Sequence, residues 1–429
     1  MPTFFSIVLE TLKESAGVFV DYWWFFMPLL LWPIFQLTWV AYVQEKYIRK
    51  IRWNLLEVKV PSESEKRPKT MEEFFSGLAS VYDVIIDTLY DIYLAGMVDS
   101  WFSFEIVSFE GDIHFYIRTP DFHRDLVESQ LYGVYPDAEI KEVEDYVVNV
   151  PNDVPGEDYN IWGTDMMLVK DSGYPIRTYK EFEDEASGEF VDPLANVVEG
   201  VSKLSPGEQI WIQILVRPCD DKWKKTARDI VLTLAGRSSG KKSSGGFFNT
   251  LINEVVDLGR HIVFDFFNSG WDMGGGEDKA EKEHLSMMLH LSPGEKDIIT
   301  GIDGKIKKPG FETDIRYIYA AKSEVFDKGK ANSVMFSYFT QFGTEYLNRF
   351  APDGKTKTSA YYFFPDARKA IKKRAIMRKY KRRELDKKSY VLTSDELATL
   401  FHFPTNEVKA PVVPRVAAKK GKPPATLPI

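Results

Sequence analysis

The stretch SWFSFEIVSFEGDIHFYIRTP, residues 100–120, decides the fold class. It holds two runs rich in β-branched and aromatic residues on either side of the turn at 110–112, which predicts a β-hairpin. The next residues, DFHRDLVESQLYGVYP (121–136), predict a helix opened by an Asp cap. DAEIKEVEDY (137–146) then predicts another strand. Because ferredoxin-like units have this β-β-α-β order, we expect an α+β fold.

The same alternation extends on both sides of this stretch. WNLLEVKVP (53–61) predicts a strand, and residues 71–96 carry apolar positions at helical spacing. Downstream, the expected helices are 192–204, 220–236 and 333–350, and the expected strands are 207–218 and 312–321. We therefore expect a body of one or two ferredoxin-like α+β layers.

The N-terminal segment differs from this body. Tyr22 to Tyr42 (YWWFFMPLLLWPIFQLTWVAY) is 21 residues without a charge, about the length that a helix needs to cross a bilayer. Trp and Tyr stand near both ends, as expected at the headgroup level. A signal peptide would have a basic leader and a small-residue cleavage site, which are both absent here. A buried core helix is the other alternative. Of the three, we expect a retained transmembrane helix over residues 22–42.

Basic residues set the expected orientation. Lys46, Arg49, Lys50 and Arg52 follow the expected span, whereas only Lys13 precedes it. Since the side richer in Lys and Arg faces the cytoplasm, we expect the N-terminus outside and the main body inside. A single cysteine in the whole chain leaves no intramolecular disulfide and suits a reducing compartment.

Arg368 to Lys388 (RKAIKKRAIMRKYKRRELDKK) is the strongest chemical signal. It holds twelve Lys and Arg against two acidic residues, in a chain of net charge -8. Three readings stay open: a solvated helix on the acidic body, a binder of nucleic-acid phosphates, or a binder of anionic lipid at the inner leaflet. The candidate nucleic-acid- or lipid-binding residues are Arg368, Lys369, Lys372, Lys373, Arg374, Arg378, Lys379, Lys381, Arg382 and Arg383.

Residues 236–292 form an expected insertion with flexible Gly/Ser-rich flanks. Its middle repeats apolar residues at helical spacing, which predicts an amphipathic helix. This helix either folds back on the body or docks a partner, and its negative charge favours a protein over anionic lipid. The candidate partner-docking residues are Phe248, Ile252, Val256, Val263 and Phe267.

Motifs for catalysis or ligand binding do not stand out. GRSSGKKSS (236–244) departs from the phosphate-loop spacing, since three residues separate its glycines and a second lysine follows Lys241. His284 and His290 are six apart, whereas the histidines of a zinc-peptidase helix are four apart. We therefore predict no catalytic residues, no cofactor and no metal.

The stretch TSDELATLFHFP (393–404) predicts a helix at the end of the body. Thr393 and Glu396 have capping-box spacing, and the prolines that follow stop the helix. No ligand or nucleophile lies near His402 in the sequence, so we expect it to be structural. The segment is predicted to act as a clasp before an extended tail.

An ordered set of segments resembles a known family. The segments are GDIHFYIRTP (111–120) with ESQLYGVYPDAEI (128–140), GEQIWIQILVRP (207–218) with DDKWKKTARDIV (220–231), KPGFETDIRYIYAAK (308–322), and SDELATLFHFPTNEVKAP (394–411) with KKGKPPATLP (419–428). Together, over roughly residues 50–429, they resemble the membrane-anchored N-terminal region of bacterial type IV secretion and conjugation proteins of the coupling-ATPase kind.

The resemblance implies a role in macromolecular transfer. In such relatives the Pro-rich stretch leads into a RecA-like motor, whereas no Walker A or B motif follows before Ile429, so we expect a motorless member. It would be a non-enzymatic, single-span bacterial inner-membrane component of a type IV secretion- or conjugation-like apparatus for DNA or protein. There it would serve as an anchor, adaptor or assembly scaffold for a separate ATPase.

Several partners and alternatives accompany this expectation. The expected partners are membrane lipids, the ATPase or other secretion subunits, DNA at the basic run, and further copies of the chain in a homo-oligomer. One alternative is a membrane-tethered nucleic-acid- or lipid-binding scaffold unrelated to secretion. Another is a membrane-anchored hydrolase with a dispersed site. The expected divisions are an amphipathic segment (1–21), the span (22–42), a juxtamembrane strand and linker (43–70), the α+β body (71–235 and 293–365), the insertion (236–292), the basic and clasp helices (366–404) and an extended tail (405–429).

Overall fold

The structure is a computed structural model of the chain. It describes residues 24, 25, 27, 28, 31–61, 67–82, 90–151, 153–156, 158–183, 190–234, 293–386 and 389–404. The amphipathic segment (1–21), the insertion (236–292) and the tail (405–429) expected from the sequence lie outside the described residues. So do the five candidate docking residues, Phe248, Ile252, Val256, Val263 and Phe267.

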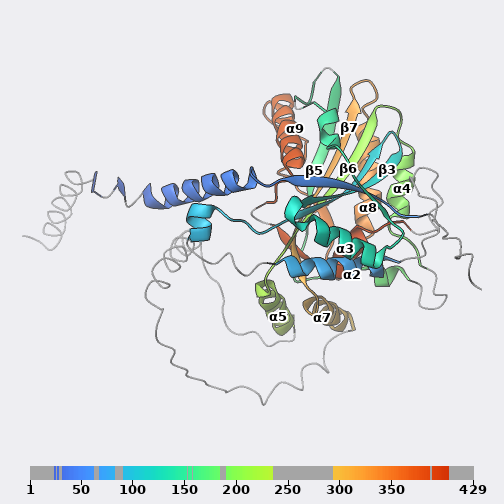
Figure 1. Ribbon diagram of the computed structural model, residues 1–429. Coiled ribbons are helices and arrows are strands. Elements are labelled where there is room, and N and C mark those ends of the chain that lie inside the picture. Colours follow the sequence, from blue (N-terminus) through green and yellow to red (C-terminus); the bar gives the residue numbers. More distant parts are fainter. Residues whose placement is uncertain are drawn as a thin grey trace, which may run out of the picture.

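One antiparallel sheet organises the body, with helices on both of its faces (Figure 1). The strands are β1 (Trp53–Lys59), β2 (Phe102–Phe109), β3 (Asp112–Pro120), β4 (Glu139–Glu142), β5 (Tyr159–Leu168), β6 (Glu208–Pro218), β7 (Gly310–Lys322), β8 (Phe350–Pro352) and β9 (Tyr390–Thr393). The helices are α2 (Pro68–Leu78), α3 (Arg124–Val134), α4 (Ala195–Ser202), α5 (Lys222–Leu234), α7 (Pro293–Ile306), α8 (Lys328–Thr340), α9 (Pro365–Arg382) and α10 (Ser394–Leu400). This confirms the α+β class.

The first half of the sheet is a βαββαβ unit. Its elements follow in the order β1, α2, β2, β3, α3 and β4, and its strands lie side by side in the order β4-β1-β3-β2. The hairpin predicted at 110–112 joins β2 to β3. Glu110 and Gly111 both have positive φ, at 54° and 103°, as a tight two-residue turn requires.

The second half repeats this topology. β5, α4, β6, β7, α8 and β8 follow in sequence, and the strands lie in the order β6-β7-β5-β8. The two units share one sheet because β2 pairs with β6 along its whole length, from Phe102 opposite Val216 to Phe109 opposite Gln209. In place of the tight hairpin of the first unit, the second carries α5, the insertion and α7 between β6 and β7.

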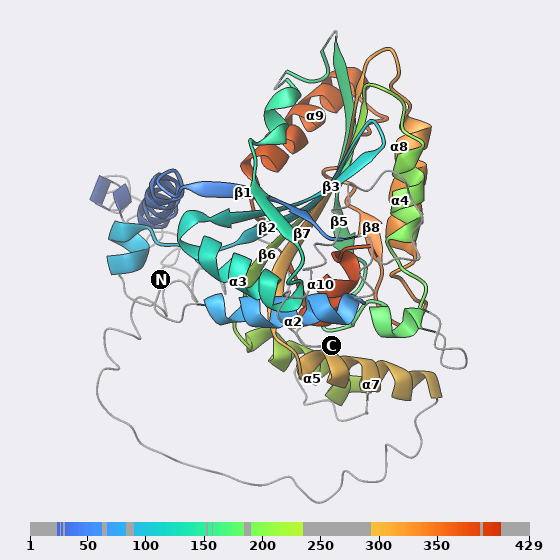
Figure 2. The ribbon, with the colours of Figure 1, turned by 45° about the vertical axis from the view of Figure 1, so that its right-hand side comes forward.

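The two faces of the sheet bury different cores. Residues of α2, α3, α4, α8 and α10 pack on one face, where Phe104 contacts Phe75 edge-on and Phe401 at a tilt. The other face buries Trp211, Ile318 and Tyr116 against α9 and the η4 turn (Tyr146–Asn149). Figure 2 shows α9 on the far side of the sheet from α2 and α10.

Several predicted elements have different limits in the structure. α2 ends at Leu78, well before residue 96, and α8 ends at Thr340 instead of residue 350. Beyond α8 the chain turns because the side chain of Asn348 is buried and donates to the carbonyls of Lys170 and Asp171. These long-range bonds compete with a helix that local spacing favours.

The strand β5 and the helix α7 lacked a sequence prediction. β5 contains Gly163, which weakens a strand pattern. A side chain at this position would meet the carbonyl of Tyr317 at 2.8 Å, so the glycine permits close pairing with β7. The need for glycine is therefore visible only when both strands are in place.

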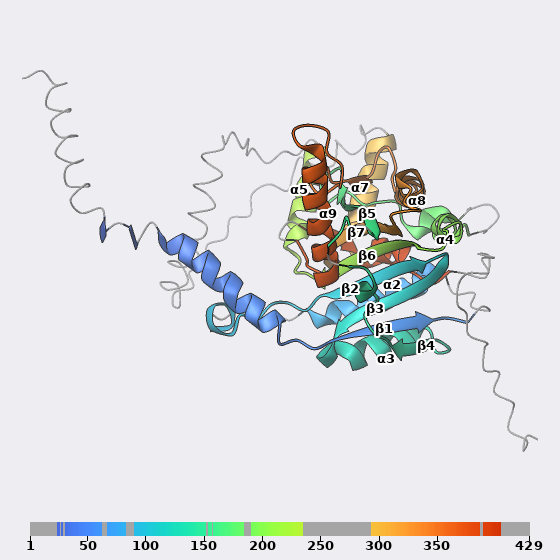
Figure 3. The same ribbon diagram turned by 90° about the horizontal axis from the view of Figure 1, so that it is seen from above.

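Residues 31–48 form a helix that projects from the body (Figures 1 and 3). Trp39 ties it to the η2 turn (Asp91–Ala95), since its indole N–H donates to the carbonyl of Tyr93 at 2.7 Å. Other aromatic side chains stay exposed, among them Trp32 at 55% and Phe35 at 54%. Within the described residues, no helix combines the length and the apolar character that crossing a membrane requires. Tyr22, Trp23, Phe26, Leu29 and Leu30 of the expected span lie outside them.

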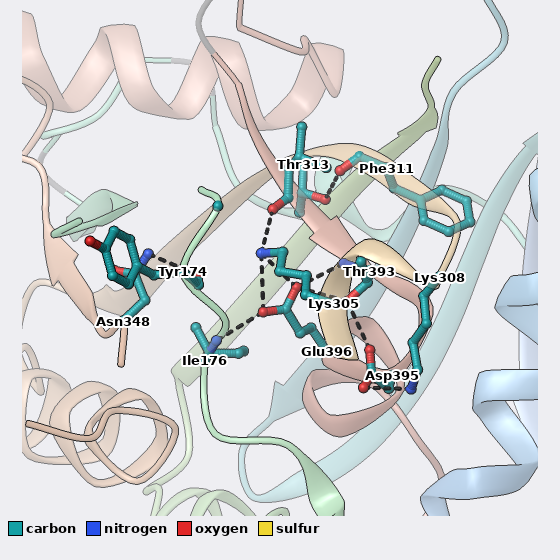
Figure 4. A network of polar contacts seen from close by, with 12 residues as sticks. Tyr174, Ile176, Lys305, Lys308, Phe311, Thr313, Asn348, Thr393, Asp395 and Glu396 are labelled. Carbon is teal, nitrogen blue, oxygen red and sulfur yellow. Dashed lines mark hydrogen bonds and ion pairs between the residues drawn. The ribbon is translucent and has the colours of Figure 1, made fainter. Parts of the chain in front are cut away.

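The clasp has the predicted cap and a buried ion pair. Thr393 and Glu396 form the capping box at the start of α10. Glu396 also binds Lys305 of α7 at 2.9 Å, and both side chains are almost fully buried (Figure 4). Lys308 joins Asp395 to Glu72 of α2, at 2.6 Å to each carboxylate. α10 therefore fastens α2 and α7 to the sheet. Beside it, β9 pairs with the beginning of β7 in antiparallel orientation.

His402 lies inside this clasp. Its Nδ1 faces the carbonyl oxygen of Ala398 at 3.0 Å and its Nε2 faces a carboxylate oxygen of Asp192 at 2.9 Å. Both ring nitrogens therefore have a polar neighbour within hydrogen-bond distance. The ring is fully buried, and the expected structural role of His402 is consistent with this packing.

Candidate functional site

The basic run forms α9, which lies across the face of the sheet that the other large helices leave open. Ile376, Met377 and Tyr380 are the buried anchors of this contact. The ring of Tyr380 packs at a tilt against Trp211 of β6, with ring centroids 5.2 Å apart. The helix therefore has an inward side and an outward side, and its charges divide between them.

A row of polar side chains crosses the sheet beneath α9. Glu105 (β2), Gln213 (β6), Arg316 (β7) and Asp165 (β5) are direct cross-strand neighbours, and we call them the polar row. Gln213 donates to Glu105 at 3.0 Å, while its oxygen accepts from Arg316 at 3.1 Å. Arg316 in turn donates to Asp165 at 3.1 Å. The row passes through the β2–β6 junction and so links the two units.

Arg383, at the end of α9, closes one end of this row. Its guanidinium binds both carboxylate oxygens of Glu105, at 2.8 and 3.1 Å, and both of Asp145, at 2.6 and 2.9 Å. Burial alone would raise the pKa of Glu105, but the charge and hydrogen bonds of Arg383 lower it to about 2. Arg383 is fully buried, so its charge serves the interior and is out of reach of an external phosphate.

Lys379 closes the other end. Its ammonium group binds Asp165 at 2.8 Å and also contacts Asp386. Nearby, burial raises the pKa of Asp314 to about 6 despite the backbone N–H of Asp386 and the charge of Arg316. The last turns of α9 are thus bound to buried carboxylates from both units.

Most other members of the basic run also contact the body. Lys373 donates to the side-chain oxygen of Asn160 at 2.5 Å, and Arg374 pairs with Asp153 at 3.0 Å. Lys372 donates to the carbonyls of Gly354 and Lys357, and Lys381 donates to that of Val150. Lys369 and Arg368 are different, since Lys369 pairs with Asp366 of α9 itself and Arg368 donates to the carbonyl of Tyr362 just before the helix. The reading of a helix docked on an acidic body describes this side of α9.

The outward side of α9 keeps free positive charge. Arg378 and Arg382 are exposed, and within the described part of the chain they form neither an ion pair nor a hydrogen bond. Together with Arg374 and Lys381 they line a recess of about 350 Å³. A recess bordered only by cations is suited to an anionic group such as a phosphate.

A larger cleft separates the N-terminal helix from the body. It has a volume of about 650 Å³. One wall is formed by Ala41, Gln44, Glu45 and Ile48 of the N-terminal helix and by Arg49, which follows it. The rest is lined by Trp53, Val98, Trp101, Arg118, Arg217, Arg382, Glu384, Leu385 and Asp386. Arg382 therefore borders both the cleft and the cationic recess.

Arg118 gives this cleft its chemical character. Its guanidinium lies 4.2 Å from the ring centroid of Trp53, which in turn lies 4.8 Å from Trp101. Burial, together with the neighbouring charge of Arg383, lowers the pKa of Arg118 to about 10, so it remains cationic at neutral pH. Among the described residues it forms no ion pair, whereas Arg49 pairs with Glu45 and Arg217 with Glu312. The cleft can accept a small anion beside an aromatic wall.

The remaining candidates from the sequence have structural surroundings. His114 binds Glu57 at 2.6 Å and stacks on Tyr116. Burial raises the pKa of the Cys219 thiol to about 12, which keeps it protonated. Over the described residues, no group of three or more His, Cys, Asp or Glu side chains could hold a metal ion. His284 and His290 lie outside these residues.

These features define the class of protein: two joined βαββαβ units with a cationic helix on one face and an aromatic helix projecting at the N-terminus. The model of a family described as a domain of unknown function, DUF8128, matches residues 42–415. The chain belongs to this family. No curated protein matches it.

Sequence reasoning missed the cleft because its parts are far apart in the chain. Trp53, Trp101, Arg118 and Arg217 come from three strands and a loop, and none of them stands in a charge run. A local signal exists only for Arg49 and Arg382, which lie in basic segments. The cleft becomes visible once the β1–β3 and β2–β6 pairings bring these residues together.

Proposed function

We propose that this protein is a non-enzymatic, membrane-anchored component of a bacterial type IV secretion- or conjugation-like transfer apparatus. In this proposal it acts as an anchor, adaptor or assembly scaffold for the ATPase of that apparatus. The helix of residues 31–48 carries the proposal, because it exposes aromatic side chains to the surroundings. Four basic residues stand at its end and in the turn that leads to the body, namely Lys46, Arg49, Lys50 and Arg52. Exposed aromatic rings followed by several Lys and Arg residues are typical of a helix that enters a bilayer.

We further propose how the chain is placed. Residues 22–42 cross the inner membrane once, the N-terminus lies outside, and the body lies in the cytoplasm. The two βαββαβ units act as ferredoxin-like modules whose outer surfaces contact other subunits, including further copies of the chain. The strand order and the pairing of β2 with β6 support this modular reading.

Fractionation and cross-linking test the proposal in two steps. The full-length chain, tagged and expressed in its native bacterial membranes, should stay in the membrane pellet after an alkaline carbonate wash. A photo-cross-linker placed at exposed Tyr346 or Lys222, away from α9, should then join the chain to an ATPase with a RecA-like motor.

The two steps fail separately. Release of the chain by carbonate would overturn the anchor. Retention in the membrane with reproducible cross-links to proteins that lack any ATPase would overturn the transfer role and leave the anchor standing. A cross-linker at buried Tyr338 is the matched control and should capture no partner.

The cationic recess favours a second candidate, a membrane-tethered scaffold that binds nucleic acid or lipid outside any secretion system. Here Arg378 and Arg382 would contact phosphates without sequence preference, and affinity for DNA should fall steeply as salt rises. Flotation of the full-length chain with anionic vesicles, compared with DNA pull-down at several salt concentrations, separates lipid from nucleic acid.

A further inference from the structure

Four consecutive aromatic residues stand exposed just before α9. Tyr361, Tyr362, Phe363 and Phe364 are exposed at 77%, 76%, 86% and 82%. Ile371, two turns into α9 from Phe364, is also exposed at 65%. Soluble monomeric proteins rarely expose large contiguous apolar patches, and where such a patch occurs it marks an interaction site. We call residues 361–364 the aromatic loop.

The backbone holds the aromatic loop in an unusual shape. Phe363 and Phe364 have φ angles of 41° and 51°, in the left-handed region that bulky side chains rarely adopt. Two bonds to α9 fix this shape: Arg368 donates to the carbonyl of Tyr362 at 2.9 Å, and its backbone N–H donates to that of Phe364 at 3.1 Å. Residues kept in such conformations gather at functional sites, because the surrounding structure must enforce them.

Positive charge accompanies the aromatic residues along the same surface of α9. Arg368 lies one turn beyond Phe364, and Arg374, Arg378 and Arg382 follow on the exposed side of the helix. Two acidic residues partner this region, since Asp366 pairs with Lys369 and Asp153 pairs with Arg374. Apolar rings beside arginines form the pattern of an interfacial membrane contact, where rings enter the headgroup layer and cations bind lipid phosphates.

The placement of α9 brings this surface toward the proposed anchor. α9 lies on the side of the body from which residues 31–48 project (Figures 1 and 3). Its last turn reaches the N-terminal helix, since Arg382 lines the same cleft as Glu45 and Arg49. The 18 residues of α9 place the aromatic loop about 27 Å from that point, at 1.5 Å per residue.

We propose that the aromatic loop and the outward arginines of α9 form a second membrane contact, which takes up the headgroup region of an anionic bilayer. This inference rests on the proposed function, because the bilayer is the one that holds the N-terminal helix. Two attachment points fix the orientation of the body on the membrane, whereas a single helix would let it swivel.

Lipid fits this surface better than the other occupants. The four side chains are exposed at 76–86% and line neither the cationic recess nor the cleft. A soft lipid layer can therefore surround them, whereas a protein partner would have to supply a matching pocket. Single-stranded nucleic acid would stack on ring faces along a groove. The cationic recess lies toward the opposite end of α9 from the rings, at Arg374, Arg378, Lys381 and Arg382. Nucleic acid is therefore kept as an outcome of the test.

Site-specific fluorescence in nanodiscs tests the inference on the full-length chain. The single cysteine, Cys219, is replaced by Ser, and an environment-sensitive dye is attached at Tyr361→Cys, at Phe35→Cys in the N-terminal helix, or at Tyr346→Cys as a control. Tyr346 is 63% exposed and lies near Gly294 at the start of α7. Nanodiscs of phosphatidylglycerol with phosphatidylcholine are compared with phosphatidylcholine alone, and lipids carrying a quencher report contact.

The expected result is quenching at positions 361 and 35 but not at 346, with stronger quenching at 361 when phosphatidylglycerol is present. Phe363→Ser should lower the ratio of inserted to free loop about tenfold, since one buried phenyl ring is lost. Quenching at 35 without quenching at 361 overturns this inference and leaves the anchor intact. Absence of quenching at 35 overturns the anchor itself. A dye at 361 that ignores lipid but responds to single-stranded DNA assigns the loop to nucleic acid and also overturns the inference.

Discussion

The inward and outward sides of α9 carry the same residue types with opposite consequences. Arg383 is fully buried between Glu105 and Asp145, whereas Arg382, its neighbour in the chain, is exposed and borders the cationic recess. The inward charges connect the last turns of α9 to the polar row and thereby to both βαββαβ units. On the outward side, Arg378 and Arg382 form no ion pair with any described residue, whereas Arg374 pairs with Asp153 at the surface. A run of basic residues therefore has no single role. The role of each charge depends on whether a carboxylate of the body lies within reach of it.

Replacement of Arg383 by Met should have the largest effect on this division. It leaves Glu105 in the interior without its cation, and breaking a buried ion pair in this way costs about 3–5 kcal/mol of the free energy of unfolding. Urea titration of the full-length chain in detergent, followed by circular dichroism, measures the loss. Arg382→Met is the matched control and should change stability by about 0.5 kcal/mol or less. Equal losses at both positions would contradict the division.

Acid should weaken the inward side through Glu105. The pKa of this carboxyl is about 2 in the folded protein, below its ordinary value of 4.5. Its ionised form therefore stabilises the fold above pH 4.5, and this contribution is lost as the pH falls from 4.5 toward 2. Glu105→Gln should lower stability at neutral pH by about 3 kcal/mol and flatten the profile over this acid range. Unfolding midpoints measured across these pH values check the prediction, and parallel profiles for both proteins would refute it.

Asp314 should show the reverse dependence on pH. Burial raises its pKa to about 6 from 3.8, so the protonated form favours the folded state below pH 3.8. That contribution is lost as the pH rises through about 6. Asp314→Asn keeps an acceptor for the backbone N–H of Asp386 but cannot titrate. Between these two pH values the free energy of unfolding of the variant should therefore fall less than that of the original chain, and the difference should be below about 3 kcal/mol. The same midpoint series tests it, and an unchanged slope between these pH values would argue against a buried carboxyl at this position.

The outward side should tolerate loss of charge. Arg378→Gln with Arg382→Gln should shift the free energy of unfolding by about 0.5 kcal/mol or less. The double variant should prefer phosphatidylglycerol over phosphatidylcholine about tenfold less, or weaker still, as measured by dye quenching at position 361. The reason is that each arginine near a lipid surface contributes about 1 kcal/mol to binding. Lys203→Gln, an exposed cation beside α4, is the control and should leave the preference unchanged. A large loss of stability in the double variant would mean that these arginines stabilise the fold, which would contradict the prediction.

The sequence predicted the local elements well where one pattern dominated. The hairpin at 110–112 and the capping box of Thr393 and Glu396 depend on residues two to four positions apart, and each lies where expected. The helix expected at 121–136 also forms, but it begins at Arg124 with His123 at its N-cap. The expected Asp cap is wrong, because the carboxylate of Asp121 accepts a hydrogen bond from Asn54. The alternation of strands and helices was enough to indicate α+β units. The end of α8 and the strand β5 were less predictable, because Asn348 and Gly163 act through partners more than 100 residues away.

The candidate site was predictable only in part. The basic run marked the right helix, but its composition does not distinguish Arg383 from Arg382. The cleft around Arg118 and Trp53 had no local signal, and the aromatic loop lacked one until its exposure was known. Side chains that meet across strands are invisible to a window of a few residues.

By itself, the sequence determined the fold class, the aromatic N-terminal helix, the basic helix and the clasp, since these follow from spacing along one segment. The tertiary structure decided that two βαββαβ units merge through β2 and β6, and that the polar row lies beneath α9. It also decided which cations are buried in pairs and which face outward. The physical reason is that a charge is stabilised in the interior only by partners within hydrogen-bond reach. For Arg383 the partner Glu105 comes from β2, 278 residues away in the chain.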